Sequence, residues 1–317
     1  MSESITIESI TRAAERIQGL AYRTPTYGSF SEKNVWFKLE SFQPVRSFKI
    51  RGAANKILSL PEKERKQRGL ITASSGNHGL AVAYVASKLG IKATIVLPED
   101  VNPDKLAIIR SLGAKAVFAG VQQDERAQKA NEIQESEGQF FIQPFNDIET
   151  ICGQATCGLE ILEDLPEVES IYVPIGGGGL VSGISASVKL SGAKARVIGV
   201  QPAGSASMYN SWKAGKLSRL EESKTIADGL KVRKPGEINF SFVKKYVDEI
   251  VLVNDPEILH ATAKLLKEEH LLAEPSGAAS FAGLLKSRKK ESEKSVAVIS
   301  GGNISSSVLS QIVSGLK

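Results

Sequence analysis

The sequence contains little cysteine and little histidine, and this scarcity excludes several kinds of site. Of its 317 residues only two are cysteines, Cys152 and Cys157, which lie five positions apart on a predicted helix and so do not face each other. We therefore expect no local disulfide and a cytoplasmic, reducing location. The three histidines are scattered without the H-E-x-x-H spacing of a metalloprotease, and neither a zinc-ligand pattern nor a G-x-S-x-G elbow occurs.

Long apolar runs and a strong charge imbalance are also lacking. No stretch approaches the roughly 20 apolar residues of a membrane span, and residues 1–20 show no apolar core of a signal peptide, so we expect no membrane association. The 40 basic and 35 acidic residues give a formal net charge of only +5. The densest basic run, 286–290, has no interleaved aromatic residues, so we expect a small-molecule partner and no nucleic acid.

Short β-branched runs that alternate with helix-length amphipathic segments dominate the rest of the sequence. Residues 77–89, 104–112 and 180–190 are examples of the predicted helices. This alternation predicts an α/β protein with parallel sheets and helices on both faces. The predicted strands are 35–39, 70–73, 93–97, 116–119, 140–143, 171–175, 197–201, 250–253 and 296–300.

The first segment with unusual chemistry surrounds Lys49, which follows a predicted strand and opens a predicted helix. A lysine at a helix start is electrostatically unfavourable, because the helix dipole places partial positive charge there. A Schiff base would remove the ammonium charge, and a nearby phosphate would reverse the field. A surface lysine in the first turn of a helix is the alternative interpretation.

The second segment, S-S-G-N-H-G at 74–79, joins a predicted strand to an alanine-rich helix. Small hydroxyl residues and free N–H groups at a helix N-terminus bind anions, and a substrate carboxylate would suit this site. The alternative is a well-capped helix with Ser74 or Ser75 as the cap. We interpret His78 as an orienting or packing histidine rather than a base.

Two glycine-rich turns complete the set. Gly176, Gly177, Gly178 and Gly179 follow a predicted strand without the lysine of a nucleotide-triphosphate loop, which favours a monophosphate over a nucleotide triphosphate. A flexible turn is the alternative interpretation. The run S-G-G-N at 300–303 follows the last predicted strand. The Ser300 hydroxyl could pair with a ring nitrogen, or it could cap a helix.

In this order and spacing, the four segments resemble the threonine dehydratase and serine racemase family of fold type II pyridoxal-phosphate enzymes. Further short motifs extend the resemblance over almost the whole chain. The motifs are R-T-P at 23–25, K-L-E at 38–40, Q-P at 43–44, S-F-K-I-R-G-A at 47–53, S-G-N-H-G at 75–79, Q-P-F at 143–145, G-Q at 153–154, G-G-G-G-L at 176–180, D-G at 228–229, E-P at 274–275 and S-G-G-N at 300–303.

The resemblance implies roles for individual residues. Lys49 would form the Schiff base with pyridoxal phosphate and then act as the acid and base at the substrate's α-carbon. The implied cofactor contacts are Phe48, Lys49, Asn77, Gly176, Gly177, Gly178, Gly179, Gly229, Glu274 and Ser300. The implied substrate contacts are Ser74, Ser75, Gly76, Asn77 and His78.

The implied reaction is the elimination of water from L-threonine or L-serine, which gives a 2-oxo acid and ammonia. An alcohol such as Ser300 does not keep the pyridine nitrogen protonated, and the weaker electron sink suits prompt loss of the β-hydroxyl. Ser75, however, occupies the position of the second base in relatives that racemise serine, whereas Val45-Arg46 resembles threonine dehydratases. A serine racemase and a dehydratase for another β-hydroxy amino acid, such as 3-hydroxyaspartate, therefore stay as alternatives.

The resemblance also implies an architecture. We expect two open, twisted, mostly parallel sheets, a large domain from 1–68 and 147–317, a small mobile domain from 69–146, and a homodimer or homotetramer. The segment 201–207 aligns with a metal loop of some relatives, but Gln201 and Ser207 are poor ligands for divalent cations, so we expect no metal there, or at most a monovalent cation. Since Lys317 follows the catalytic unit closely, we expect no control through the regulatory domain of the long biosynthetic dehydratases.

Overall fold

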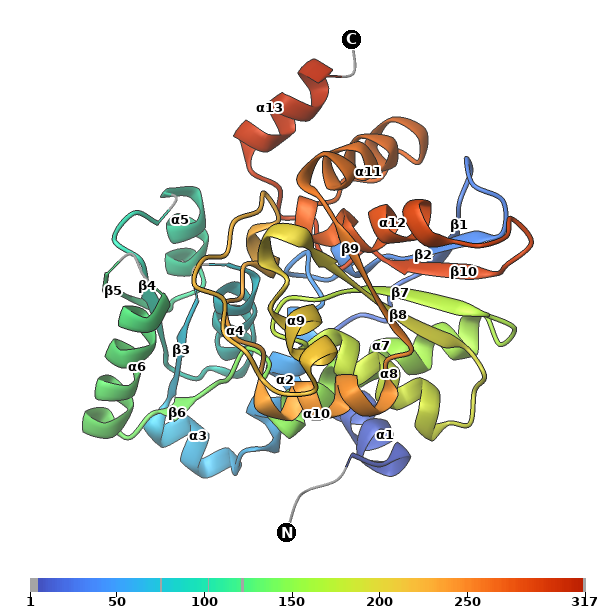
Figure 1. Cartoon of the computed structure of the whole chain (residues 1–317). Helices are drawn as coiled ribbons and strands as arrows, with labels where there is room; N and C mark the ends of the chain where they lie inside the picture. The colour runs from blue at the N-terminus through green and yellow to red at the C-terminus, as the bar shows by residue number, and fades with distance from the viewer. Residues whose placement is uncertain (1–4, 75, 102, 121–122, 316–317) are drawn as a thin grey trace.

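The computed structural model describes residues 5–74, 76–101, 103–120 and 123–315, in which strands and helices alternate (Figure 1). In these ranges no helix has the length and apolar character needed to cross a membrane. The strands are β1 (Thr26–Gly28), β2 (Val35–Lys38), β3 (Leu70–Ala73), β4 (Ala93–Leu97), β5 (Lys115–Phe118), β6 (Phe140–Phe141), β7 (Ser170–Pro174), β8 (Arg196–Pro202), β9 (Glu249–Val253) and β10 (Ser295–Val298).

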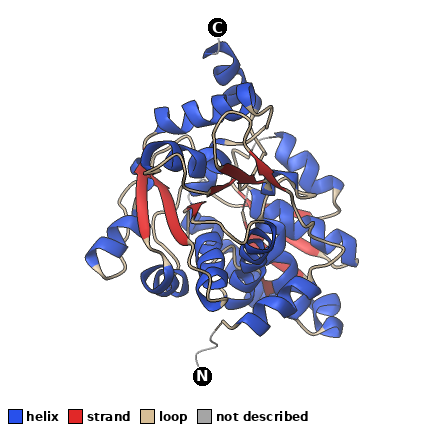
Figure 2. Ribbon diagram, turned by 90° about the vertical axis from the view of Figure 1, so that its right-hand side faces the viewer, coloured by secondary structure: helices blue, strands red, loops and turns tan. Residues whose placement is uncertain are grey.

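The helices cover the strands from outside (Figure 2). They are α1 (Ile7–Arg16), α2 (Lys49–Ser59), α3 (Glu62–Arg68), α4 (Asn77–Leu89), α5 (Pro103–Ser111), α6 (Gln123–Glu137), α7 (Ile148–Asp164), α8 (Gly179–Leu190), α9 (Ser207–Ala214), α10 (Glu237–Tyr246), α11 (Asp255–Glu268), α12 (Pro275–Ser287) and α13 (Ser306–Gly315), with the short 3-10 helices η1 (Glu40–Phe42), η2 (Ala203–Ser205) and η3 (Asp228–Leu230).

The strands form two sheets, which confirms the predicted fold class. One sheet has the order β1-β2-β10-β7-β8-β9 and is parallel except for the antiparallel pair β1–β2. The other has the order β5-β4-β3-β6 and is parallel throughout. All strands of this smaller sheet come from one continuous stretch of chain, whereas the larger sheet takes strands from both sides of that stretch.

Two features of the sheets differ from the sequence prediction. The strand β1 was not predicted, because its three residues are too few to show an alternating pattern. The predicted strand 140–143 ends early, at Phe141. The Ile142 carbonyl instead accepts a hydrogen bond from the Thr72 hydroxyl (2.9 Å) and lies 2.9 Å from Nε2 of His78, so these side chains replace the ladder.

Side chains of the larger sheet alternate between two apolar cores. In β7, Ile171 and Val173 point toward α7, α8 and α10, whereas Tyr172 points toward α11 and α12. In β10, Val296 and Ala297 divide in the same way. Since both faces of β7 and β10 are buried, these strands read as continuous apolar runs, which is the pattern of a parallel sheet covered on both sides.

Helix α2 belongs to the cores of both halves of the molecule. Its Ile50, Ala53 and Ile57 side chains pack with α4 and with the smaller sheet. Its opposite side packs closely on α7, which also carries the two cysteines, both with free, buried thiols. The helix is therefore fixed between the two sheets (Figure 1).

Glycines permit the close approach of α2 and α7. A β-carbon added at Gly153 of α7 would lie 2.7 Å from the Gly52 α-carbon and would also overlap the Arg51 carbonyl oxygen. A β-carbon added at Gly52 would meet Thr150 at 2.8 Å. These contacts are with backbone or with packed side chains, so an added methyl group could be accommodated only if the helices moved apart.

We predict that Gly153→Ala lowers the free energy of unfolding by about 1–3 kcal/mol, because the extra methyl group overpacks this helix pair. Urea denaturation followed by circular dichroism would measure the change. Gly315→Ala is the matched control, since a β-carbon there meets nothing within 4 Å. Equal stability of Gly153→Ala and the wild type would contradict the close packing.

Candidate active site

Four helices begin at residues that the sequence singled out: α2 at Lys49, α4 at Asn77, α8 at Gly179, and α12 directly after Glu274. Among the described residues, the N-cap residue of none of these four helices forms a side-chain cap, whereas Asp147 caps α7. At α2 the Ser47 hydroxyl accepts a long hydrogen bond from the Lys49 N–H (3.3 Å). Uncapped N-termini present free N–H groups and partial positive charge. They are suited to hold anions.

Lys49 is half-buried at the start of α2. Its Nζ donates a hydrogen bond to the Pro144 carbonyl (3.0 Å) and lies 5.1 Å from the centre of the Phe48 ring. Burial lowers the pKa of the Lys49 amine to about 8. A substantial fraction of the amine is therefore neutral, and so nucleophilic, near physiological pH.

The chain before Lys49 is joined to the loop after β10. Ser47 and Gly301 form an antiparallel bridge, and the Phe48 N–H donates to the Ser300 carbonyl (3.1 Å). The Ser300 hydroxyl is buried and lies 3.5 Å from the Ser276 carbonyl, at the upper limit of a hydrogen bond. The two segments that the sequence placed far apart are thus in direct contact.

The four glycines at 176–179 connect β7 to α8 through a tight turn. Gly178 has φ +102°, which only glycine adopts easily, and a β-carbon at Gly177 would lie 2.6 Å from the Phe145 ring. At Gly176 it would lie 3.1 Å from the Gly229 carbonyl oxygen. The Gly229 N–H in turn donates to the Ser276 hydroxyl (2.9 Å).

Asn77 links the start of α4 to the same loop. Its Nδ2 donates to Oε1 of Glu274 (2.6 Å), and its Oδ1 accepts from Nδ2 of Asn303 (2.8 Å). The Glu274 N–H donates to the Gly301 carbonyl (3.0 Å), and burial raises the pKa of the Glu274 carboxyl. Lys49, Asn77, Glu274 and Ser300 therefore surround one region.

The loop 74–78 lies beside that region, although Ser75 is outside the described residues. The Ser74 hydroxyl accepts a hydrogen bond from the Gly76 N–H (3.3 Å). His78 is buried, and its Nε2 donates to the Ile142 carbonyl (2.9 Å) in the neutral tautomer. Burial, together with the charge of Lys49, lowers the pKa of His78 to about 3, so this ring is neutral near pH 7. A neutral, hydrogen-bonded ring supports an orienting role.

Sequence reasoning assigned no role to Asn303 or Ser276, which connect the predicted residues. Asn303 joins Asn77 to the Val45 carbonyl (2.9 Å), and Ser276 joins Gly229 to Ser300. The only signal for Asn303 was its place at the end of S-G-G-N. For Ser276 no sequence signal distinguished it from an ordinary first-turn serine of a helix.

Side chains of the segment 201–207, which resembles a metal loop of some relatives, form hydrogen bonds with neighbouring parts of the chain. Oε1 of Gln201 accepts from the Tyr209 N–H (2.9 Å), and the Ser205 hydroxyl donates to the Leu230 carbonyl (2.9 Å). The Ser207 hydroxyl donates to a further carbonyl. Within the described part of the chain, no group of three or more His, Cys, Asp or Glu side chains could hold a metal ion.

Comparison with known proteins identifies the family of this chain. Residues 17–301 match the family described as "Pyridoxal-phosphate dependent enzyme". The chain belongs to this family. Its cofactor is accordingly pyridoxal phosphate, and the protein is an enzyme, as the sequence predicted.

Individual relatives of this pyridoxal-phosphate enzyme have more specific names. It is 44% identical over 314 residues to L-threonine ammonia-lyase of Thermotoga maritima, a match that covers 98% of this chain and 78% of the relative. It is 38% identical over 316 residues to catabolic L-threonine dehydratase of Escherichia coli K12, covering 97% and 96%. The solved structure of maize serine racemase has 34% identity and a TM-score of 0.92, covering 98% and 97%.

The residues present fit pyridoxal phosphate. A Schiff base needs an amine of lowered pKa, and Lys49 has one. A phosphate needs a close backbone approach at a helix N-terminus, and the glycine turn before α8 has no β-carbons to prevent it.

The neutral buried state of His78 makes stability depend on pH. Because its pKa falls from 6.5 when unfolded to about 3 when folded, the unfolded state binds more protons between these values. This contribution to stability is complete above pH 6.5 and is lost as the pH falls toward 3.

We therefore predict that, between about pH 7 and pH 5, the wild type loses about 2 kcal/mol more of its free energy of unfolding than His78→Gln does. Glutamine keeps an N–H donor for the Ile142 carbonyl but does not titrate. Denaturant unfolding at each pH would measure both proteins. The same pH dependence in both would show that His78 is not held neutral.

Proposed function

We propose that this enzyme is an ammonia-lyase that removes water from L-threonine and L-serine and releases a 2-oxo acid and ammonia. The observation that carries the proposal is the Lys49 amine, with its pKa near 8, beside the loop of Ser300 and the first turn of α2. The names of the Thermotoga and Escherichia relatives support threonine as the substrate.

We propose that the cofactor is held from several elements at once. Its phosphate would accept hydrogen bonds from the N–H groups of the turn 176–179. Its aldehyde would bind Lys49, and its ring nitrogen would pair with Ser300. Pyridoxal phosphate, when bound, withdraws electrons from the α-carbon of the amino acid. The remaining proposed contacts are Phe48, Asn77, Gly229 and Glu274.

In this proposal the protein's own groups handle protons and charge. Nζ of Lys49 takes the proton from the substrate's α-carbon, because its lowered pKa makes the neutral amine available. The N–H groups at the start of α4, with Ser74, Ser75, Gly76 and His78, bind the substrate carboxylate. Glu274, whose pKa is raised by burial, accepts a hydrogen bond from Asn77 at the start of α4.

We propose the domain division expected from the sequence. The stretch 69–146 supplies every strand of the smaller sheet, and 1–68 with 147–317 supplies the larger one. A movement of the smaller unit would bring the loop 74–78 onto the substrate and exclude water.

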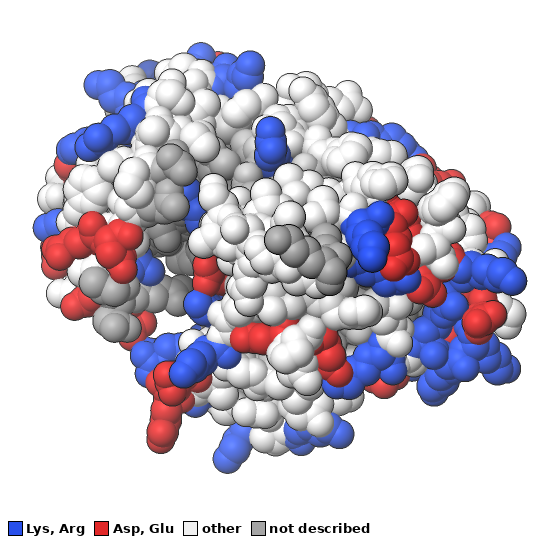
Figure 3. Space-filling model, turned by 90° about the horizontal axis from the view of Figure 1, so that it is seen from above, with Lys and Arg blue, Asp and Glu red and all other residues white. Residues whose placement is uncertain are grey.

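We also propose an amino acid as the small-molecule partner, a cytoplasmic location and a homodimer or homotetramer. On the upper face, most charged side chains lie toward the edges, where residues of both signs occur together (Figure 3), whereas a polyanion site would gather Lys and Arg. The free, buried thiols of Cys152 and Cys157 suit a reducing compartment. Exposed aromatic residues near β1, among them Phe30 at 87% exposure, suit a subunit interface.

We predict that Lys49→Ala loses turnover by about 10³-fold or more, because both the cofactor attachment and the base are removed. Borohydride should fix the cofactor to Lys49 in the wild type, and peptide mass spectrometry should locate it. Lys56→Ala, on the same helix but paired with Asp147, is the matched control and should keep its activity. Retained turnover in Lys49→Ala would contradict the assignment of Lys49 as the cofactor-binding lysine and base.

We further predict that L-threonine and L-serine are converted to 2-oxo acids faster than 3-hydroxyaspartate or phenylserine. Oxo-acid detection across this panel would rank the substrates, and chiral chromatography after incubation with L-serine would detect racemisation. The formation of D-serine faster than pyruvate would replace our proposal with the racemase alternative.

A further inference from the structure

The first turn of α2 needs an anchor that its own N-terminus does not supply. In the described chain the N-cap residue, Phe48, makes no side-chain cap hydrogen bond, and the partial positive charge of the helix dipole disfavours an ammonium at Lys49. Backbone bonds to the loop after β10 hold Ser47 and Phe48, and only a long bond from the Lys49 N–H to the Ser47 hydroxyl (3.3 Å) extends this hold to the turn that follows. The side chain of Arg51 lies in that turn.

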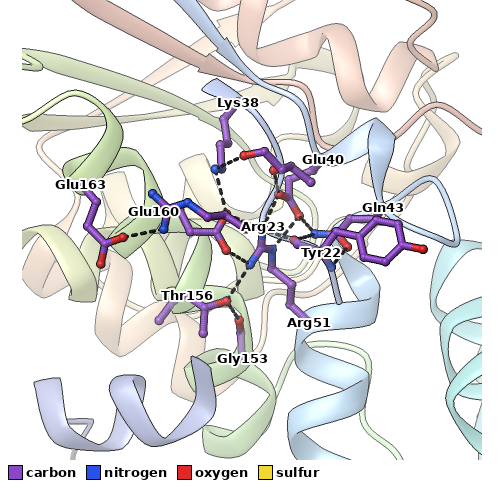
Figure 4. Close-up of polar contacts among 12 residues, drawn as sticks. Tyr22, Arg23, Lys38, Glu40, Gln43, Arg51, Gly153, Thr156, Glu160 and Glu163 are labelled. Atoms are coloured by element: carbon purple, nitrogen blue, oxygen red, sulfur yellow. Dashed lines mark hydrogen bonds and ion pairs between the residues drawn. The ribbon is translucent and has the colours of Figure 1, made fainter. Parts of the chain in front are cut away.

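Arg51 is almost completely buried, at 1% exposure, and two edges of its guanidinium group form hydrogen bonds (Figure 4). Nε and Nη2 donate to the two carboxylate oxygens of Glu40, each at 2.8 Å. Nη1 and Nη2 donate to the two oxygens of Glu160 at 2.6 and 2.8 Å. Nη1 also donates to the Thr156 hydroxyl (3.0 Å), and Nη2 to the Tyr22 carbonyl (3.2 Å).

The two carboxylates are themselves fixed. Glu40, on η1, is fully buried and accepts hydrogen bonds from the Thr24 hydroxyl (2.6 Å) and the Gln43 amide (3.1 Å). Glu160, on α7, also pairs with Lys38 of β2 at 2.8 Å, and Lys38 is fully buried. Burial alone would raise the pKa of Glu40, but the Arg51 guanidinium lowers it, so this carboxylate stays charged.

The ion pairs of Arg51 constrain the orientation of the first turn of α2 more than they stabilise the fold. Replacing one buried ion pair by well-packed apolar side chains is often neutral for stability, because both charges must be desolvated. A planar guanidinium with bidentate bonds to two separate elements nevertheless allows one orientation of the turn that carries it. Because residues two apart point to opposite sides of a helix, Arg51 faces η1 and α7, while Lys49 faces Pro144.

We propose that Arg51 is a positioning residue for Lys49: its two bidentate pairs, with Glu40 and Glu160, fix the first turn of α2 and keep the Lys49 amine at its desolvated place. The effect on turnover rests on the proposed function, in which this amine carries the cofactor and moves the proton. The effect on the amine itself does not, and it can be measured without cofactor.

The test uses Arg51→Lys, which keeps the positive charge but cannot form two bidentate pairs. In the cofactor-free protein, the pH dependence of Lys49 acylation, followed by peptide mass spectrometry, gives the midpoint for this amine. We expect the midpoint to rise from about 8 toward the ordinary value of 10.5, because a looser turn lets water reach the ammonium. In the holoenzyme kcat should fall about tenfold or more, while KM changes by less than about threefold.

Two further variants keep the result interpretable. Arg23→Gln removes an exposed arginine whose ion pairs in the described chain are with Glu163 and Asp164 of α7 and not with α2, and it should match the wild type in midpoint and kcat. Glu160→Gln keeps the ion pair between Arg51 and Glu40 and removes the negative charge from the second pair of Arg51. It should give a smaller shift of both quantities, and it replaces Arg51→Lys if that variant does not fold.

The outcomes separate the positioning role from a merely structural one. A folded Arg51→Lys with a wild-type midpoint and a wild-type kcat overturns the proposal, even if its Tm is lower. If Arg51→Lys does not fold, wild-type values in Glu160→Gln overturn it. If borohydride fixes no cofactor to Lys49 of the wild type, the proposed function fails, while the midpoint in the cofactor-free variants still decides the role of Arg51.

Discussion

The placement of α2 between the two sheets is the constraint on which the site depends. One side of the helix packs with α4 and the smaller sheet, and the other meets α7 at glycines without room for a β-carbon. Lys49 is the first residue of this helix, so any change in the helix position moves the Lys49 amine. The loop 74–78 follows β3 of the smaller sheet, and α2 joins the core of that sheet to the core around α7.

Charge around the site follows from the same packing. Four uncapped helix N-termini meet where a lysine is half-buried, and together they create a region that disfavours a further positive charge. The lowered pKa of Lys49 and the neutral state of His78 are responses to burial in that region. An anionic cofactor and an anionic substrate group would compensate the field that the folded chain cannot compensate itself.

Much of the fold could be predicted from the sequence, because parallel strands buried on both faces appear as apolar runs separated by turns. The strand β1 escaped prediction, since Thr26–Gly28 gains its structure from pairing with β2 rather than from a pattern of its own. Lys49 and the four glycines were visible because they break the local rules for helices and turns. Asn303, Ser276 and Arg51 were assigned no role, because their partners lie far away in sequence and only the fold brings them together.

The burial of both cysteines in α7 has a consequence for how the enzyme meets oxidants. Burial raises the pKa of Cys152 to about 11, and burial together with the Glu40 carboxylate raises the pKa of Cys157 well above its ordinary value. Thiols that stay protonated and shielded react slowly with peroxides and alkylating reagents. Cys157 lies beside the ion pairs of Arg51, so the interior behind Lys49 holds a thiol that is shielded from oxidants.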